Sequence, residues 1–260
     1  MTRKRPPAPS RPARRAPIRF GPLELTGRTR SHVVPLDDSR CALHPATLAA
    51  FVRLRSAARR AGFELAPASG FRDFATQLGI WNGKWTGQRP LLDRAGRPLA
   101  AARLRPAARV RAILLWSAPP GASRHHWGSD LDVYDRAALA PGGRLLLIPA
   151  EYAEGGPFAA LTGWLDVNMG RFGFYRPYRT DRGGVQPEPW HLSHWPTARE
   201  ASRRLRIGTL RSALAGAELE GRRALLAALP GVYGRYVRAV DRPPASCVAG
   251  PAGSSRPRGA

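Results

Sequence analysis

Four of the six histidines in the chain lie in two short segments that also hold carboxylates and tryptophans. His125 and His126 are neighbours, and His191 and His194 follow further along the chain. A single histidine is more often structural than a ligand, but two clusters with acidic groups favour a shared site. Neutral imidazoles with one carboxylate are a ligand set that suits zinc. The sequence therefore predicts a zinc site that the fold assembles from both segments.

The first segment combines a loop histidine with a strand carboxylate. Gly128 lies between His125 and Asp132 and lets the chain bend, so that both side chains can converge on one ion. Asp130 and Asp132 alternate with two apolar residues, which predicts a half-buried strand with both carboxylates on one face.

The second segment places a carboxylate three residues before a histidine. A zinc hydrolase needs a base that takes a proton from water and passes it to the leaving amine, and Glu188 beside His191 can supply it. Pro189 prevents a regular helix here, so the segment is not the helical His-Glu-x-x-His motif. The alternative is a surface turn in which Glu188 forms a salt bridge.

The other two clustered histidines have open roles. His126 is adjacent to His125 and is expected to point elsewhere, against Trp127. His194 either holds a ligand or the substrate in place, or is an interior residue that packs like an aromatic side chain.

Together these segments resemble a known family. The pattern Ser-x-His-x-x-Gly-x-x-x-Asp at 123–132 and Glu-Pro-Trp-His at 188–191 resemble motifs of the zinc D-alanyl-D-alanine carboxypeptidases of the VanY type. Ser-Gly-Phe-Arg at 69–72, with Gln77 five residues after the arginine, is similar to a third motif of that family. The motifs occur in the family's order, and the resemblance covers residues 33–197.

The resemblance implies a catalytic site with one zinc ion. Its protein ligands would be His125, Asp132 and His191, with a water at the fourth position, which a catalytic site leaves open. Glu188 would be the general base and acid. The implied reaction is hydrolysis of the terminal D-Ala of peptidoglycan stem peptides or their precursors.

The resemblance also implies substrate contacts. Arg72 would grip the substrate carboxylate or stabilise the developing oxyanion, as a planar guanidinium can do either. Ser123 and Gln77 would form hydrogen bonds to the substrate. Asp73, next to Arg72, is expected to be either part of this motif or simply a helix cap.

The sequence departs from the family pattern at two places and leaves several functional alternatives open. Asp130 stands where the family commonly has a small residue, and it either supports a ligand or competes as one. Trp127 and its neighbours add bulk beside the predicted metal, which bears on substrate choice. An endopeptidase with the same zinc chemistry is the nearest alternative, and a non-catalytic zinc-stabilised binding module is another. No nucleic-acid recognition motif accompanies the basic residues.

Spacing predicts an α+β fold, a small antiparallel sheet flanked by helices, of the Hedgehog/DD-peptidase type that the resemblance implies. Helices are expected over 45–61, from the cap Asp73 past Trp81, and over 157–169. A short strand is expected over 63–68.

The remaining segments are less regular. Residues 82–108 are expected to form a loop, and residues 109–116 either a short helix or a buried strand. Thr197-Ala-Arg-Glu200 reads as a capping box that opens a helical region ending near residue 240.

Composition suggests four regions. These are a basic, Pro/Arg-rich disordered segment (1–30), a zinc metallopeptidase domain (31–198), a helical C-terminal extension (199–242) and a disordered tail (243–260). The net charge is +24, and the three regions outside 31–198 together carry two thirds of it. This charge fits anionic wall polymers or substrate carboxylates as well as phosphate.

Compartment and assembly are not determined by the sequence. Cys41 and Cys247 are too few and too far apart for a disulfide framework. No apolar run approaches the length of a membrane span, and no signal peptide is recognisable, although peptidoglycan as substrate implies the cell envelope or periplasm. The oligomeric state stays open.

Overall fold

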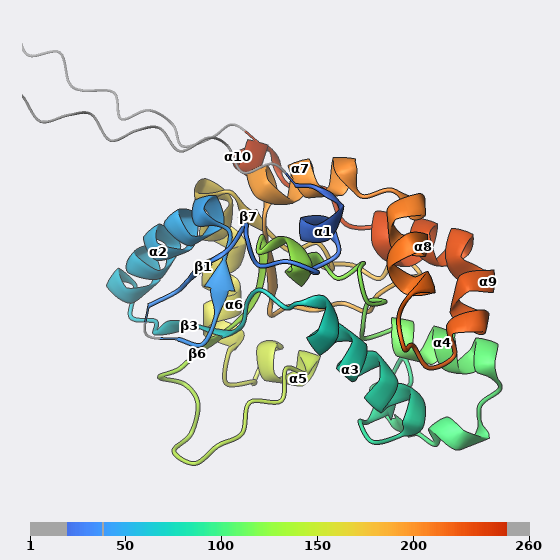
Figure 1. Cartoon of the computed structure of the whole chain (residues 1–260). Helices are drawn as coiled ribbons and strands as arrows, with labels where there is room; N and C mark the ends of the chain where they lie inside the picture. The colour runs from blue at the N-terminus through green and yellow to red at the C-terminus, as the bar shows by residue number, and fades with distance from the viewer. Residues whose placement is uncertain (1–19, 38, 249–260) are drawn as a thin grey trace, which may run out of the picture.

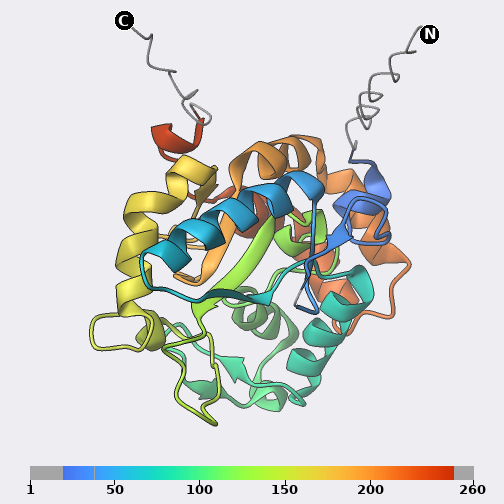
Figure 2. The ribbon, with the colours of Figure 1, turned by 90° about the vertical axis from the view of Figure 1, so that its left-hand side faces the viewer.

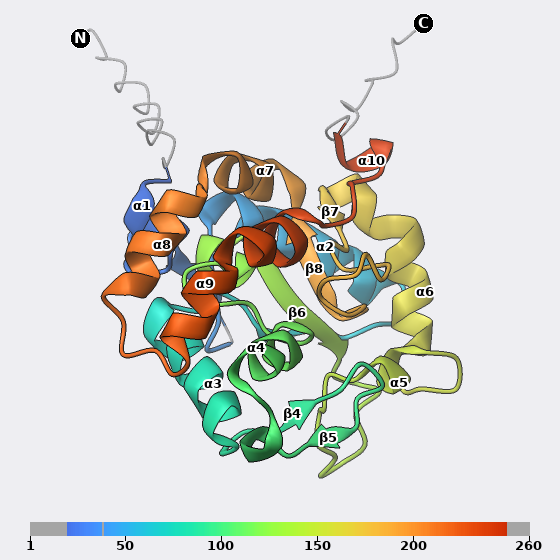
Figure 3. The same ribbon diagram turned by 90° about the vertical axis from the view of Figure 1, so that its right-hand side faces the viewer.

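A four-stranded antiparallel sheet forms the centre of the molecule. The computed structural model describes residues 20–37 and 39–248. The sheet has the order β3-β6-β8-β7, and β6 crosses its middle (Figure 3). Its strands are β3 (Leu65–Ser69), β6 (Asp130–Asp135), β8 (His191–His194) and β7 (Phe174–Tyr175). The predicted α+β fold with a small antiparallel sheet flanked by helices is confirmed.

One face of this sheet packs against two helices. These are α2 (Pro45–Arg60) and α6 (Ala159–Asn168), and α6 continues into η3 (Met169–Phe172). Figure 2 shows α2 lying across the sheet. Apolar side chains from strands and helices form a shared core here, including Phe51, Leu131, Val133, Leu161 and Leu192. Because side chains alternate along a strand, the neighbours of Leu131 and Leu192 face the opposite side, where the site lies.

A larger apolar core lies on the other side of the molecule, among helices that are far apart in the sequence. Its members include Trp81, Ile113, Leu210, Leu225 and Leu229. The helices are α3 (Phe74–Thr86), α4 (Pro106–Leu114), α7 (Trp195–Arg204), α8 (Ile207–Ala215), α9 (Arg222–Val232) and the π-helical η4 (Tyr233–Arg238). Figure 1 shows α9 beside both α8 and α4. The residues expected to form a helical extension are helical, but they share one core with α3 and α4.

Short elements complete the described chain. They are α1 (Pro22–Leu25), β1 (Val34–Pro35), β2 (Ala42–Leu43), β4 (Leu91–Leu92), β5 (Pro98–Leu99), η1 (Ala101–Arg103), η2 (Arg124–Trp127), α5 (Pro149–Tyr152) and α10 (Ala245–Val248).

Two expectations about local structure are wrong. Residues 82–108 are not one loop, since they hold the end of α3, the β4–β5 hairpin and η1. Thr197 does not cap a helix, because α7 already begins at Trp195, with Pro196 in its first turn. The Thr197 hydroxyl instead lies 2.9 Å from His194 Nδ1. By contrast, Asp73 is the N-cap of α3, as expected, and accepts a hydrogen bond from Thr76 N at 2.8 Å.

Parts of both segments that were predicted to be disordered are folded. Phe20 and Leu25 are buried in the larger core, and α1 is folded. At the other end, the Cys247 thiol is buried and donates a hydrogen bond to the Phe174 carbonyl. Disorder is therefore wrong for residues 20–30 and 243–248, while residues 1–19 and 249–260 lie outside the described residues. Among the described helices, none is long and apolar enough to cross a membrane.

Candidate metal centre

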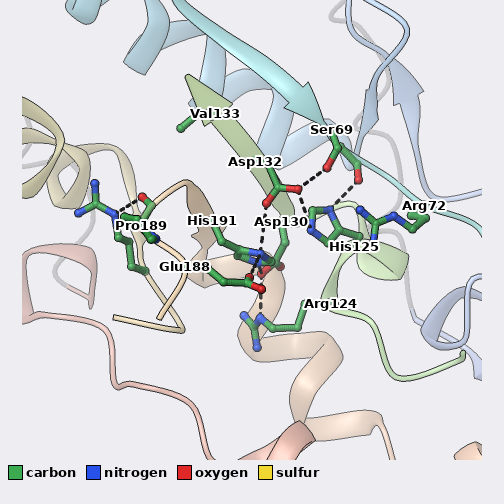
Figure 4. A network of polar contacts seen from close by, with 12 residues as sticks. Ser69, Arg72, Arg124, His125, Asp130, Asp132, Val133, Glu188, Pro189 and His191 are labelled. Atoms are coloured by element: carbon green, nitrogen blue, oxygen red, sulfur yellow. Dashed lines mark hydrogen bonds and ion pairs between the residues drawn. The ribbon is translucent and has the colours of Figure 1, made fainter. Parts of the chain in front are cut away.

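Three predicted metal ligands meet at the face of the sheet opposite α2. His125 comes from η2, Asp132 from β6 and His191 from β8. Asp132 and His191 are direct cross-strand partners in the antiparallel register. One ligand atom from each of the three residues lies within 4.8 Å of the others, and all three residues are buried. Figure 4 shows these side chains pointing toward one another.

The His125 ring is fixed by a hydrogen bond on the side away from the cluster. Its Nδ1 lies 2.8 Å from the Gly70 carbonyl, so Nδ1 carries the proton, and its Nε2 faces Asp132 Oδ2 at 3.6 Å. Gly128 ends η2 with φ of +63°, and a Cβ there would lie 2.6 Å from the Val33 side chain. The left-handed turn and the close packing both require glycine, as the bend predicted between His125 and Asp132 implied.

The Asp132 carboxylate has one satisfied oxygen and one orphaned oxygen. The Ser69 hydroxyl donates to Oδ2 at 2.6 Å. Oδ1 is buried and has no hydrogen-bond partner. A buried carboxylate oxygen without a partner is costly, and a bound cation would remove that cost. The donor set and this orphaned atom therefore fit a zinc ion held by His125, Asp132 and His191.

Asp130 orients the third predicted ligand, His191. Its Oδ1 accepts a hydrogen bond from His191 Nε2 at 2.9 Å, which leaves His191 Nδ1 toward Asp132 Oδ1 at 3.4 Å and Glu188 Oε2 at 3.2 Å. A carboxylate on the far nitrogen of a ligand histidine fixes its tautomer and raises its basicity. The structure thus places Asp130 behind His191, where it supports this side chain.

Asp130 is itself held by a buried cation. Arg124 Nε donates to Asp130 Oδ1 at 2.8 Å, and its other end reaches Ser193 Oγ and Tyr175 Oη. Burial alone would raise the pKa of Asp130, but Arg124 and His191 outweigh it and hold that pKa well below its usual range. The strand expected to be half-buried is buried on both faces, because this network covers its polar side.

Glu188 lies beside the ligand cluster. It belongs to a turn in which its backbone N–H donates to the Tyr178 carbonyl and its own carbonyl accepts from His191 N. Its side chain is 12% exposed, so the alternative of a surface turn is wrong. Burial raises the pKa of Glu188, against the opposing effect of the nearby His191. A carboxyl group with a raised pKa is suited to accepting and returning a proton near neutral pH.

The cluster opens into a pocket of about 760 Å³. Arg72, Ser123 and Glu188 line it together with the three predicted ligands. Gln77 does not line it, because its amide is fully buried. Its Oε1 accepts from Arg72 at 2.9 Å and its Nε2 donates to the Ala118 carbonyl at 2.8 Å. The expected hydrogen bond from Gln77 to the substrate is therefore not favoured, and this residue positions the Arg72 guanidinium instead.

The two remaining clustered histidines are interior. His126 Nδ1 donates to the Arg72 carbonyl at 2.6 Å, and its Nε2 accepts from Gly121 N at 3.0 Å, so it joins two of the motifs. These bonds, rather than packing against Trp127, define its place. The His194 ring packs against Phe174 and bonds Thr197, which corresponds to the interior alternative.

Sequence reasoning missed two parts of this centre. Arg124 carries no local signal, since it is one of many arginines, and only its burial against Asp130 reveals its role. The second is the hydrogen bond from Arg72 to Gln77, for which the five-residue spacing in the motif is the available sequence signal. Alternation along β6 does indicate that Asp130 shares the face of Asp132.

Three predicted ligands that face an open pocket, with a buried carboxylate beside them, are the arrangement expected of a catalytic rather than a structural metal site. A family model described as VanY, D-alanyl-D-alanine carboxypeptidase, matches residues 40–197. The match spans more than half of the chain, and the chain belongs to this carboxypeptidase family. The resemblance inferred from the three motifs is confirmed.

The chain also resembles individual proteins. It is 36% identical over 118 residues to an uncharacterised protein of Haemophilus influenzae, covering 45% of this chain and 90% of that protein. A second uncharacterised protein of this organism is 39% identical over 104 residues, covering 39% of this chain and 71% of that protein.

Solved structures with a similar fold have lower identity. A variant of the vancomycin-resistance D,D-pentapeptidase VanY in complex with Zn(II) is 22% identical, with a TM-score of 0.45, and the match covers 74% of this chain and 88% of that one. The LD-carboxypeptidase LdcB is 21% identical, with a TM-score of 0.46, and the match covers 67% of this chain and 74% of that one. At these values, the similarities assign no role to any residue of this chain.

Proposed function

We propose that this protein is a zinc-dependent D-alanyl-D-alanine carboxypeptidase that releases the terminal D-Ala from peptidoglycan stem peptides or their precursors. The observation that carries the proposal is the position of Glu188, 3.2 Å from the ligand His191 and at the wall of the pocket. A binding module that had lost catalysis would not need a buried carboxylate there, where burial is costly.

The ligands His125, Asp132 and His191 would hold one zinc ion. When bound, zinc supplies Lewis acidity, which makes water a better nucleophile and polarises a carbonyl group. Glu188 then serves the two proton transfers: its carboxylate accepts a proton from water and returns it to the leaving amine of D-Ala. Asp130 keeps the His191 ring in one orientation during both steps.

Two pocket residues would bind the peptide. Arg72 is aligned by Gln77 and has no carboxylate partner among the described residues, so its guanidinium is available to the substrate carboxylate or to a developing oxyanion. The Ser123 side chain lines the same pocket and would supply a hydrogen bond.

The decisive test compares the wild type with Glu188→Gln on a pentapeptide that ends in D-Ala-D-Ala. We expect the variant to retain one zinc per chain by metal analysis and to release D-Ala more slowly by a factor on the order of 10² to 10⁴, because the proton carrier is lost. Glu64→Gln is the matched control, since Glu64 is an exposed carboxylate paired with Arg136. D-Ala release by Glu188→Gln at the wild-type rate would overturn the mechanism.

Two further arms separate the alternatives. A chelator should abolish release and added zinc should restore it. A carboxypeptidase requires the free carboxylate of the last residue, so amidation of the peptide's C-terminus should stop cleavage. Cleavage of the amidated peptide at the wild-type rate would favour the endopeptidase.

A further inference from the structure

Three cations that line the pocket have no carboxylate partner among the described residues. Arg72 contacts the neutral Gln77, Lys84 contacts the neutral Ser117, and Arg89 has no ion pair. The other two arginines of the lining are neutralised, since Arg124 pairs with Asp130 and Arg94 pairs with Asp181. The pocket therefore holds more positive charge than the proposed reaction uses.

Lys84 differs from the other two cations in residue type and lies on the face of α3 that lines the pocket. Gln77, Ile80 and Lys84 follow one another at helical spacing and share one face of α3, and Ile80 and Lys84 line the pocket. The Lys84 ammonium donates to Ser117 Oγ at 2.7 Å. It is the single lysine of the described residues, in a chain that uses arginine almost everywhere else.

The surroundings of Lys84 penalise its charge. Burial lowers the pKa of Lys84 to about 8, and Arg72 and Arg89 add to this, although Glu188 opposes it. Removing an ammonium group from water is costly unless an anion compensates it, and a hydroxyl oxygen does so only in part. Cations left without a counter-charge in a cleft are typical of a site that receives an anionic ligand.

We propose that Lys84, with Arg89 at the pocket rim, binds a carboxylate of the substrate peptide that is separate from the group held by Arg72. The inference rests on the proposed function, because it takes the ligand to be a peptide. Two carboxylates of such a peptide have the required chemistry: the C-terminal carboxylate of the leaving residue and a free carboxylate on the acyl side of the scissile bond. A compact ammonium accepts either one as a point charge.

Binding measurements on the zinc-loaded Glu188→Gln protein test this without turnover. The probes are a pentapeptide ending in D-Ala-D-Ala with one acyl-side carboxylate, the same peptide amidated at its C-terminus, and the same peptide amidated on the acyl side. We expect Lys84→Met to raise the Kd of the free peptide about tenfold or more, since hydrogen bonds to charged groups contribute about 1.5–3 kcal/mol. Lys84→Arg, which keeps the charge, should raise it by about threefold or less.

The amidated peptides identify the carboxylate. One of the two amidated peptides lacks the carboxylate that Lys84 binds, and for that peptide Lys84→Met should change the Kd by less than about twofold. For the other amidated peptide, Lys84→Met should raise the Kd as much as it does for the free peptide. Arg136→Met removes an exposed charge outside the pocket and controls for long-range electrostatics. Its expected effect is within about twofold. Thermal melting confirms that each variant is folded.

Two results would overturn the subsite: a Kd of the free peptide that Lys84→Met changes by less than twofold, or an equal loss on all three peptides. The proposed function fails separately. If the wild type released no D-Ala but its binding depended on Lys84, the reaction assignment would be wrong and the subsite would stand. If the wild type released D-Ala and Lys84→Met bound and cleaved normally, the subsite would be wrong and the reaction assignment would stand.

Discussion

Asp130→Asn should destabilise the metal-free protein strongly, even though it replaces one side chain by another of the same shape. Asp130 is fully buried and Arg124 is 4% exposed, so the substitution leaves the guanidinium inside the protein without its counter-charge. Removal of one partner of a buried ion pair costs about 3–5 kcal/mol. We expect the free energy of unfolding to fall by that amount.

Urea denaturation in the presence of a chelator, followed by far-UV circular dichroism, measures this loss without a contribution from zinc. The double variant Arg124→Met, Asp130→Asn removes both charges together. Because no unpaired charge then remains, it should recover most of the stability and lie within about 2 kcal/mol of the wild type. The residual loss reflects the hydrogen bonds from Arg124 to Ser193 and Tyr175.

The single and the double variant should differ in stability but should both bind zinc more weakly than the wild type. Both lack the carboxylate that accepts from His191 Nε2. Loss of such a partner typically weakens metal binding about 10- to 100-fold. Competition with a chromogenic chelator should therefore show weakened binding in the single and the double variant alike.

The control is an exposed pair of the same kind. Glu200 and Arg204 lie one turn apart on α7, and both side chains are about half exposed. Glu200→Gln should cost about 0.5 kcal/mol or less. An unpaired buried charge is not the cause of the loss if Asp130→Asn costs no more than this control, or if the double variant is less stable than Asp130→Asn.

Two further predictions concern stability. His126 and His194 are buried, and burial lowers their pKa values to about 3 and about 4, so the unfolded chain binds protons first as the pH falls below about 6.5. The free energy of unfolding should therefore drop as the pH falls from 6.5 toward 4, by roughly 2 kcal/mol per histidine at pH 5. Urea denaturation midpoints at pH 7 and pH 5 measure this drop. The His194→Gln variant should lose less stability between these two pH values than the wild type. Gly128→Ala should cost about 2 kcal/mol or more, because its Cβ would lie 2.6 Å from Val33 and 2.7 Å from His44 N at a positive φ. Gly142→Ala has a similar φ of +73° but open space around it, and an equal loss there would show that packing at Gly128 adds nothing.

Much of the site could be predicted from the sequence because its residues lie in short segments with internal spacing. His125, Gly128 and Asp132 are close in the chain, and so are Glu188 and His191. The sequence does not show what brings the two segments together. That is the antiparallel register of β6 and β8, which places Asp132 opposite His191.

The parts that could not be predicted depend on long-range packing. The hairpin of β4 and β5 has two residues in each strand, too few for any periodicity, and it exists because Leu91 is buried in the larger core. The capping-box prediction at Thr197 failed because α7 already begins at Trp195 and the Thr197 hydroxyl bonds the buried His194 ring. Pro196 in the first turn was the better signal for the start of α7.

The role of each positive charge in this chain depends on the partner of the individual side chain. Arg124 and Arg72 are the same residue type and lie near the same cluster, yet their partners differ. The charge of Arg124 is matched by Asp130, which in turn orients the predicted metal ligand His191. The Arg72 guanidinium is aligned by a neutral amide and keeps its charge available in the pocket, as Lys84 does beside Ser117. Whether the nearest partner is a carboxylate or a neutral oxygen therefore separates the cations that build the site from those that can bind a peptide.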